Sequence, residues 1–113
     1  MTMTRDFVEA WEKVAQRDNL DFREYREKYG LIEVDLVFWF LEQLGRLLQQ
    51  GLIDIDQMPV PYGQIKFMWE KIEPIAEGSR KIWNEPRVAR GFEYLYNEMK
   101  KREQLQQGGV KNG

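Results

Sequence analysis

The chain has 113 residues, of which 42% are hydrophobic and 32% charged, and this composition predicts one folded domain rather than a disordered segment. Its 17 basic and 19 acidic residues give a net charge of −2, which provides no overall attraction to nucleic acids or anionic lipids. Cysteine and histidine are both absent. Disulfides, Cys/His zinc sites and histidine-based catalytic triads are therefore excluded.

The chain begins with a pattern that predicts two short helices. The first covers about residues 6–17, where apolar residues recur at helical spacing. Its inward stripe consists of Phe7, Ala10, Trp11, Val14 and Ala15. The second covers residues 22–29, because Asp21 followed by Glu24 is typical of a helix start, and Gly30 is typical of a helix end.

The third predicted helix, residues 33–50, is the most apolar segment and ends at Gly51. Apolar residues surround nearly all of its first half, including Leu36, Trp39 and Phe40. A helix that is apolar on most sides is usually buried at the centre of a fold, so we expect it to be the core element. Its apolar run is much shorter than the roughly 20 residues of a membrane span, and no targeting segment is visible. We therefore expect a soluble, cytoplasmic protein without membrane association.

Prolines organise the next part of the chain. A short turn is predicted at residues 54–58, followed by extended backbone through residues 59–61, because each proline disfavours helix at the residue before it. A fourth helix is predicted from about residue 62 to Trp83. Pro74 lies inside it and should bend it.

A last helix is predicted from Asn84, acting as its N-cap, to Leu105. No segment alternates apolar and polar residues as a strand would. The predicted fold class is therefore all-α, a single compact bundle of about five helices. We expect one domain over residues 1–107 and a disordered tail over residues 108–113.

Glutamates one helical turn apart form the first candidate site, and the longest ladder is Glu70, Glu73 and Glu77. Carboxylates at this spacing share a helix face and bind Mg²⁺ or Mn²⁺ in all-α nucleotide pyrophosphohydrolases. Lys71 and other bases interleave the ladders, which is typical of an ordinary solvated helix face. We therefore expect no metal and no cofactor, and a metal-dependent phosphohydrolase is the alternative function.

The second candidate is a basic segment that contains one aromatic residue: Arg80, Lys81, Trp83, Arg87 and Arg90. Such a segment can contact phosphates and stack on a base, and a phosphate can also bind at the helix start expected at Asn84. Two glutamates lie in the same segment and the chain is mildly acidic. Nucleic-acid binding is therefore disfavoured and is the second alternative function.

Aromatic residues make up 13% of the chain and give the third signal. Trp11, Trp39, Trp69 and Phe92 fall on inward helical stripes and predict core packing. One small interior does not readily hold all the aromatic rings, so part of them is expected on a partner-facing surface. The candidate interaction surface consists of Trp83, Arg87, Arg90 and Tyr94.

One charged pair is expected inside the fold. Arg80 follows Ala76 by one helical turn and should lie near the face that Trp69 buries. Glu42 is the acidic residue that lies beside the apolar face of the third predicted helix. We hypothesise that these two side chains form a structural ion pair that fixes helix register and adds little net stability.

Several segments within residues 34–101 resemble a prokaryotic family of small helical proteins known only as a domain of unknown function. In chain order they are Phe40-Leu41-Glu42-Gln43-Leu44-Gly45, Gly51-Leu52-Ile53-Asp54, Gly63, Trp69-Glu70-Lys71-Ile72-Glu73-Pro74-Ile75, Arg80 and Phe92-Glu93-Tyr94-Leu95. The resemblance implies a helical fold and no particular reaction, substrate or catalytic residue. Several relatives carry a membrane helix before this domain, whereas this sequence shows none, and Pro59-Val60-Pro61 departs from the family pattern.

These observations together favour a non-catalytic helical module for protein interaction or regulation. The expected partner is a protein, either another protein or a second copy of this chain. If the chain forms a homodimer, a two-fold arrangement through the third or the last helix is expected.

Overall fold

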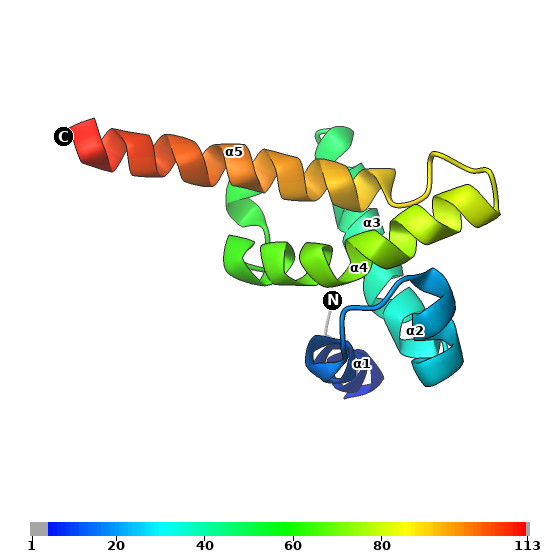
Figure 1. Cartoon of the computed structure of the whole chain (residues 1–113). Helices are drawn as coiled ribbons and strands as arrows, with labels where there is room; N and C mark the ends of the chain where they lie inside the picture. Colours follow the sequence, from blue (N-terminus) through cyan, green and yellow to red (C-terminus); the bar gives the residue numbers. More distant parts are fainter. Residues whose placement is uncertain (1–4, 113) are drawn as a thin grey trace.

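A computed structural model describes residues 5–112, with side chains as far as residue 106. In chain order its elements are α1 (Arg5–Gln16), α2 (Phe22–Tyr29), α3 (Ile32–Gln49), the short 3-10 helix η1 (Ile55–Gln57), α4 (Tyr62–Ile82) and α5 (Arg90–Asn112) (Figure 1). The described residues include no strand, which confirms the predicted all-α class. None of these helices combines the length and the apolar character needed to cross a membrane.

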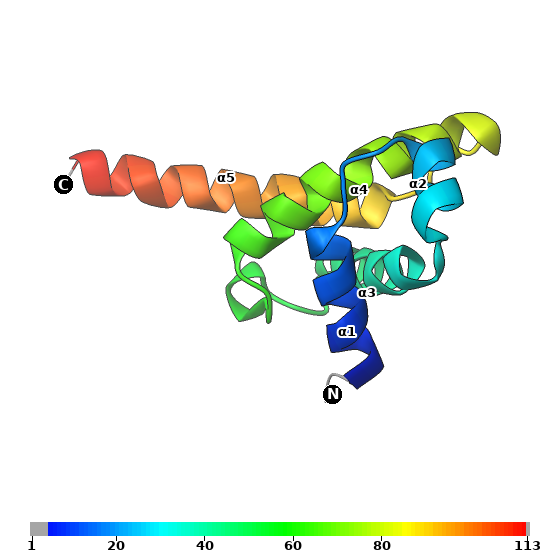
Figure 2. The same cartoon turned by 60° about the horizontal axis from the view of Figure 1, so that its bottom comes forward.

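α3 lies at the centre of the fold. It packs extensively along α5 and also against α1, while α4 packs against α2 and α5 (Figures 1 and 2). Its residues Val34, Val37 and Leu41 are fully or almost fully buried. They join one hydrophobic core with side chains from every other α-helix, which include Val14, Phe22, Ile65, Ile72, Phe92 and Leu95. This helix therefore contributes to the core as predicted, but it is not buried on nearly all sides, because Ile32 and Trp39 are exposed.

Local signals determine several helix ends as predicted. The Asp21 side chain accepts a hydrogen bond from the backbone N–H of Glu24 and caps the start of α2, and Gly30 ends that helix with a φ of 74°. α3 ends at the C-cap residue Gln50, and the following Gly51 also has a φ of 74°. There the N–H of Leu52 donates to the carbonyl of Leu47, and the N–H of Gly51 donates to that of Leu48. These two bonds form a Schellman motif.

The prediction that Asn84 caps the last helix is wrong, because Asn84 ends α4 instead. Its φ is 48°, and its N–H donates to the carbonyl of Lys81, while the N–H of Glu85 donates to that of Arg80. Asparagine is one of the few residues other than glycine that adopts this conformation readily, so it completes a second Schellman motif. Turns follow, and α5 begins only at Arg90.

A buried carboxylate of α3 caps the start of α5. The Oε1 atom of Glu42 accepts a hydrogen bond of 2.7 Å from the backbone N–H of Phe92, which lies in the first turn of α5. Glu42 is only 6% exposed. The helices approach so closely here that a Cβ atom on Gly45 would overlap the carbonyl oxygen of Gly91. A Cβ on Gly91 would lie 2.6 Å from the backbone oxygen of Glu42.

The aromatic residues separate into a buried and an exposed set. Trp69 is 4% exposed, meets Phe92 edge-on at 5.1 Å between ring centroids and stacks on Tyr96 at 5.8 Å, which confirms the predicted core positions of Trp69 and Phe92. Trp11 is half-buried beside Phe7. The prediction for Trp39 is wrong, because this residue is 56% exposed. α1 and α5 cover other sides of α3 and leave this side uncovered.

Two predictions about helix shape have different outcomes. α5 is helical to Asn112, beyond the end expected near Leu105, and its C-terminal half projects past the other helices in both views (Figures 1 and 2). The expected tail thus has a helical backbone over residues 108–112, while its side chains and Gly113 lie outside the described part. Its disorder in solution stays a prediction. Pro74 lies inside α4, and the bend expected there also stays a prediction.

Removing the Trp69 ring should destabilise the fold strongly. We expect Trp69→Ala to lower the free energy of unfolding by about 3–5 kcal/mol, because it leaves a cavity under Phe92 and Tyr96. Phe67→Ala on the same helix is the matched control and should cost less than about 1 kcal/mol, since Phe67 is 46% exposed. Urea unfolding followed by circular dichroism measures both values. Equal losses would contradict the assigned core.

Adding one methyl group at two helical glycines should change stability in opposite directions. Gly45→Ala would force its Cβ into the backbone of Gly91 and should cost about 1–3 kcal/mol or more. A Cβ on Gly63 would meet no atom within 4 Å, so Gly63→Ala should raise stability by up to about 1 kcal/mol through helix propensity. Thermal unfolding of both variants tests this. A stabilising Gly45→Ala would show that α3 and α5 are not in such close contact.

Candidate functional site

The predicted acidic ladder lies on the solvent side of α4. Glu70, Glu73 and Glu77 are all exposed, and Glu77 forms an ion pair of 2.5 Å with Arg80. In the part of the chain that the structure describes, no three acidic side chains converge in a geometry suited to a metal ion. The ladder therefore has the surroundings of an ordinary charged helix face.

The hypothesised pair between Glu42 and Arg80 is not formed, although both side chains are largely buried as expected. The carboxylate of Glu42 binds the N–H of Phe92, and its second oxygen lies 3.6 Å from Arg46. The guanidinium of Arg80 donates to the carbonyl oxygen of Val88 and pairs with Glu77 and Glu93. Because α5 starts later than predicted, its N-terminus reaches Glu42, and Arg80 binds the turn that precedes α5.

Most of the predicted basic segment is neutralised by neighbouring acids. Arg87 donates two hydrogen bonds of 3.0 Å to the two carboxylate oxygens of Glu85. These bonds and the backbone N–H of Arg87 lower the pKa of Glu85 to about 2. Arg90 pairs with Glu93 at 2.7 Å. The arginines expected to contact phosphate therefore already have anionic partners within the chain.

The predicted interaction surface is divided between two features. Trp83 and Arg87 lie in the turn between α4 and α5, where Trp83 is largely exposed. Arg90 occupies the first turn of α5, and Tyr94 lies one turn further along, where it lines a groove. The phosphate site expected at Asn84 lacks its structural basis, because Asn84 ends a helix and starts none.

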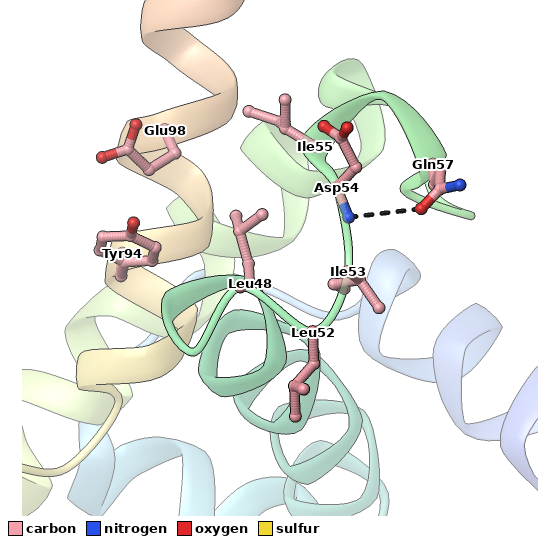
Figure 3. A pocket seen from close by; sticks show the side chains of 9 residues that line it. Leu48, Leu52, Ile53, Asp54, Ile55, Gln57, Tyr94 and Glu98 are labelled. Atoms are coloured by element: carbon pink, nitrogen blue, oxygen red, sulfur yellow. Dashed lines mark hydrogen bonds between the residues drawn. The ribbon is translucent and has the colours of Figure 1, made fainter.

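That groove has a volume of about 460 Å³ and lies between α5 and the segment that follows α3. Figure 3 shows Tyr94 and Glu98 on one side, and Leu52, Ile53 and Ile55 on the other, with Leu48 between them. The backbone N–H of Asp54 donates to the side-chain oxygen of Gln57, which closes the turn at the groove edge. The walls combine apolar side chains with polar ones, among which Asp54 and Glu98 are acidic.

The most unusual surface lies on the uncovered side of α3. Large apolar residues project from it at helical spacing with one polar residue among them, and we call this row the α3 stripe: Ile32, Leu36, Trp39, Gln43 and Leu47. Ile32 is 84% exposed and Trp39 56%, while Leu36 and Leu47 are about one-third exposed. Single exposed apolar residues are common on protein surfaces, whereas several large ones gathered on one helix face are unusual.

The stripe continues into the groove. Leu52 is exposed and lines the groove, and its N–H binds the carbonyl of Leu47 in the Schellman motif at the end of α3. In this motif, the residues at the positions of Leu47 and Leu52 frequently contact each other through their side chains. Leu52 therefore places the groove next to the C-terminal end of the stripe.

Two opposite charges flank the stripe. Asp35 and Arg46 are about three helical turns apart, so they lie on the same flank, one near each end. Partial burial raises the pKa of Asp35, and this carboxylate has no ion-pair partner among the described residues. Arg46 is largely exposed and lies 3.6 Å from Glu42. The flank therefore carries an acid at the start of α3 and a base at its end.

Sequence reasoning missed this surface because it interpreted the apolar character around α3 as burial on all sides. A signal for the exposed side is present in the sequence. Asp35, Gln43 and Arg46 all fall within about 80° of one another on the helix, and such a group of polar residues favours a side that faces water. The apolar residues between them are therefore the ones expected to be exposed.

In comparisons with protein-family models, curated proteins and solved structures, no match to this chain was found. The family resemblance of residues 34–101 stays a hypothesis.

The ion pair in the turn between α4 and α5 should be visible in a pH titration. The pKa of Glu85 is held at about 2, below its ordinary value of 4.5, so the pair is intact above pH 4.5 and is lost as the pH falls toward 2. Arg87→Gln should return the pKa of Glu85 toward its ordinary value. Carbon-13 NMR of the glutamate carboxyl groups measures both midpoints, and an unchanged midpoint in the variant would contradict the pairing.

Proposed function

We propose that this chain is a non-catalytic helical module that binds a partner protein through the α3 stripe. The observation that supports the proposal is the exposure of Ile32, Leu36, Trp39 and Leu47 on one face of a helix whose other sides are packed. Burying such a face in a complex removes apolar surface from water, which is the main favourable contribution to protein association. Tryptophan is also among the residues that contribute most to binding at interfaces.

The charged surfaces give weaker support to the two alternative functions. A phosphohydrolase would need a second set of acids facing Glu70, Glu73 or Glu77, and these three side chains point to solvent without converging acids among the described residues. A nucleic-acid surface would need free cations, and three of the four bases of the basic segment, Arg80, Arg87 and Arg90, are each paired with a glutamate. Of the four, only Lys81 is exposed without an ion-pair partner among the described residues. Both alternatives stay hypotheses, and interaction through the stripe is the better supported function.

Charge placed on the stripe should abolish binding without unfolding the chain. We expect Trp39→Glu to lose the proteins that the wild-type chain retains from a cell extract, because a charge at this position opposes burial of the face. Phe67→Glu is the matched control, since Phe67 is an exposed aromatic residue on α4, outside the stripe. Mass spectrometry identifies the retained proteins, including further copies of the chain.

Circular dichroism should show that both variants keep the wild-type helix content. Identical retention by Trp39→Glu and the wild type would contradict binding through the stripe. Failure of the wild-type chain to retain any protein, together with strictly monomeric sedimentation, would contradict the interaction function itself.

A further inference from the structure

We infer, on the basis of the proposed function, that the partner of the α3 stripe is a second copy of this chain, bound with the two α3 helices antiparallel around a two-fold axis. The inference starts from the spacing of the stripe. Its ends are Ile32 and Leu47, and its midpoint falls beside Trp39. A two-fold axis at that midpoint brings Ile32 of one copy opposite Leu47 of the other, and Leu36 opposite Gln43.

This arrangement places the largest apolar side chain at the centre of the contact. Trp39 of each copy lies next to the axis, with Leu36 of the partner on one side of it and Gln43 of the partner on the other. Binding energy is typically concentrated in a central, fully desolvated aromatic residue surrounded by smaller contacts. The stripe extends over about 22 Å of helix, so the leucine and isoleucine side chains near its ends also take part in the contact.

The charges that flank the stripe favour the same orientation. When the two-fold axis is perpendicular to α3, the flank that carries Asp35 and Arg46 in one copy lies beside the same flank of the other copy. In this antiparallel orientation, Asp35 of each copy lies near Arg46 of its partner, and the contact occurs twice. A two-fold axis parallel to α3 would instead place the two charged flanks on opposite sides of the contact, where Asp35 and Arg46 do not meet. Opposite charges that meet in only one orientation select that orientation.

Both charges can reach such a contact from the free chain. Asp35 has no ion-pair partner among the described residues, and Arg46, although it pairs with Glu42 of its own helix at 3.6 Å, keeps 57% of its side chain exposed. Antiparallel packing also places the positive N-terminal end of each α3 dipole beside the negative C-terminal end of the other. Apolar spacing, flanking charge and helix dipole therefore all match a second copy of the same face.

Sedimentation equilibrium of the full chain tests the association directly. The wild-type chain should change from monomer to dimer as its concentration rises through the micromolar range. Trp39→Ala should weaken the dimer by more than about tenfold, whereas Phe67→Ala should leave it unchanged. A wild-type chain that stays monomeric, or a dimer that Trp39→Ala does not weaken, would overturn the inference.

A charge exchange tests the pairing of Asp35 with Arg46. Asp35→Arg and Arg46→Glu should each fail to dimerise alone, because each places like charges in contact. An equimolar mixture of the two variants should form a heterodimer, since both contacts then join opposite charges. Circular dichroism verifies that each variant is folded. A folded mixture that stays monomeric would overturn the assigned contact.

Disulfide trapping tests the orientation without relying on the charge variants. The chain has no cysteine, so single cysteines can be introduced without competing thiols. An oxidised mixture of Ile32→Cys and Leu47→Cys should give mainly the mixed dimer if the helices are antiparallel. Phe67→Cys, which lies outside the stripe, should not cross-link to itself. Self-linked dimers of the Ile32→Cys and Leu47→Cys variants would instead indicate a parallel contact and overturn the inference.

The outcomes also separate this inference from the proposed function. A monomeric wild-type chain that retains another protein in a Trp39-dependent way would overturn self-association and leave the interaction module supported. A monomeric chain that retains nothing would contradict both.

Discussion

The carboxylate of Glu42 holds the start of α5 against α3, and the remaining arrangement depends on this contact. The hydrogen bond from the N–H of Phe92 places a negative charge at the positive end of a helix, in a buried position where water does not compete. Gly45 and Gly91 permit the required approach, because a Cβ on either would overlap the neighbouring backbone. Ala89, the buried residue before α5, has a φ of 65°, and this strained conformation turns the chain so that the first amides of α5 face α3.

This contact explains why one side of α3 stays exposed. α5 covers the side of α3 that contains Glu42 and Gly45, and α1 covers another side, where Phe7 meets Phe40 at 4.7 Å between ring centroids. Arg102 of α5 binds Asp56 of η1 at 2.7 Å, and beyond this point the helix projects away from the others (Figure 2). Among the described residues, no further helix returns to cover the α3 stripe. The C-terminal half of α5 instead projects past the other helices (Figures 1 and 2).

The sequence was sufficient to predict the helices and most of their ends, but not every contact between them. Gly30 and Gly51 end helices by a local property of glycine that needs no tertiary context. Asn84 was misassigned because asparagine is suited to both ends of a helix, and the choice here depends on Glu42, which lies far away in the sequence and provides the cap of α5. Likewise, Glu42 and Arg80 could be recognised as inward-facing, but their partners depend on where α5 begins. The exposure of Trp39 depends on which sides of α3 the other helices cover.

The same packing determines which surface can bind a partner at low cost. In the turn between α4 and α5, Arg87 and Arg90 are satisfied by Glu85 and Glu93, so a ligand there must first displace existing ion pairs. The α3 stripe presents mainly apolar side chains, and removing them from water is favourable without breaking any bond within the chain. The charged residues beside it, Asp35 and Arg46, lie at the flank, where opposite charges restrict the orientation of a partner more than they add to its affinity. In the proposed dimer, selectivity for one orientation and the free energy of binding would therefore come from different residues of the same helix face.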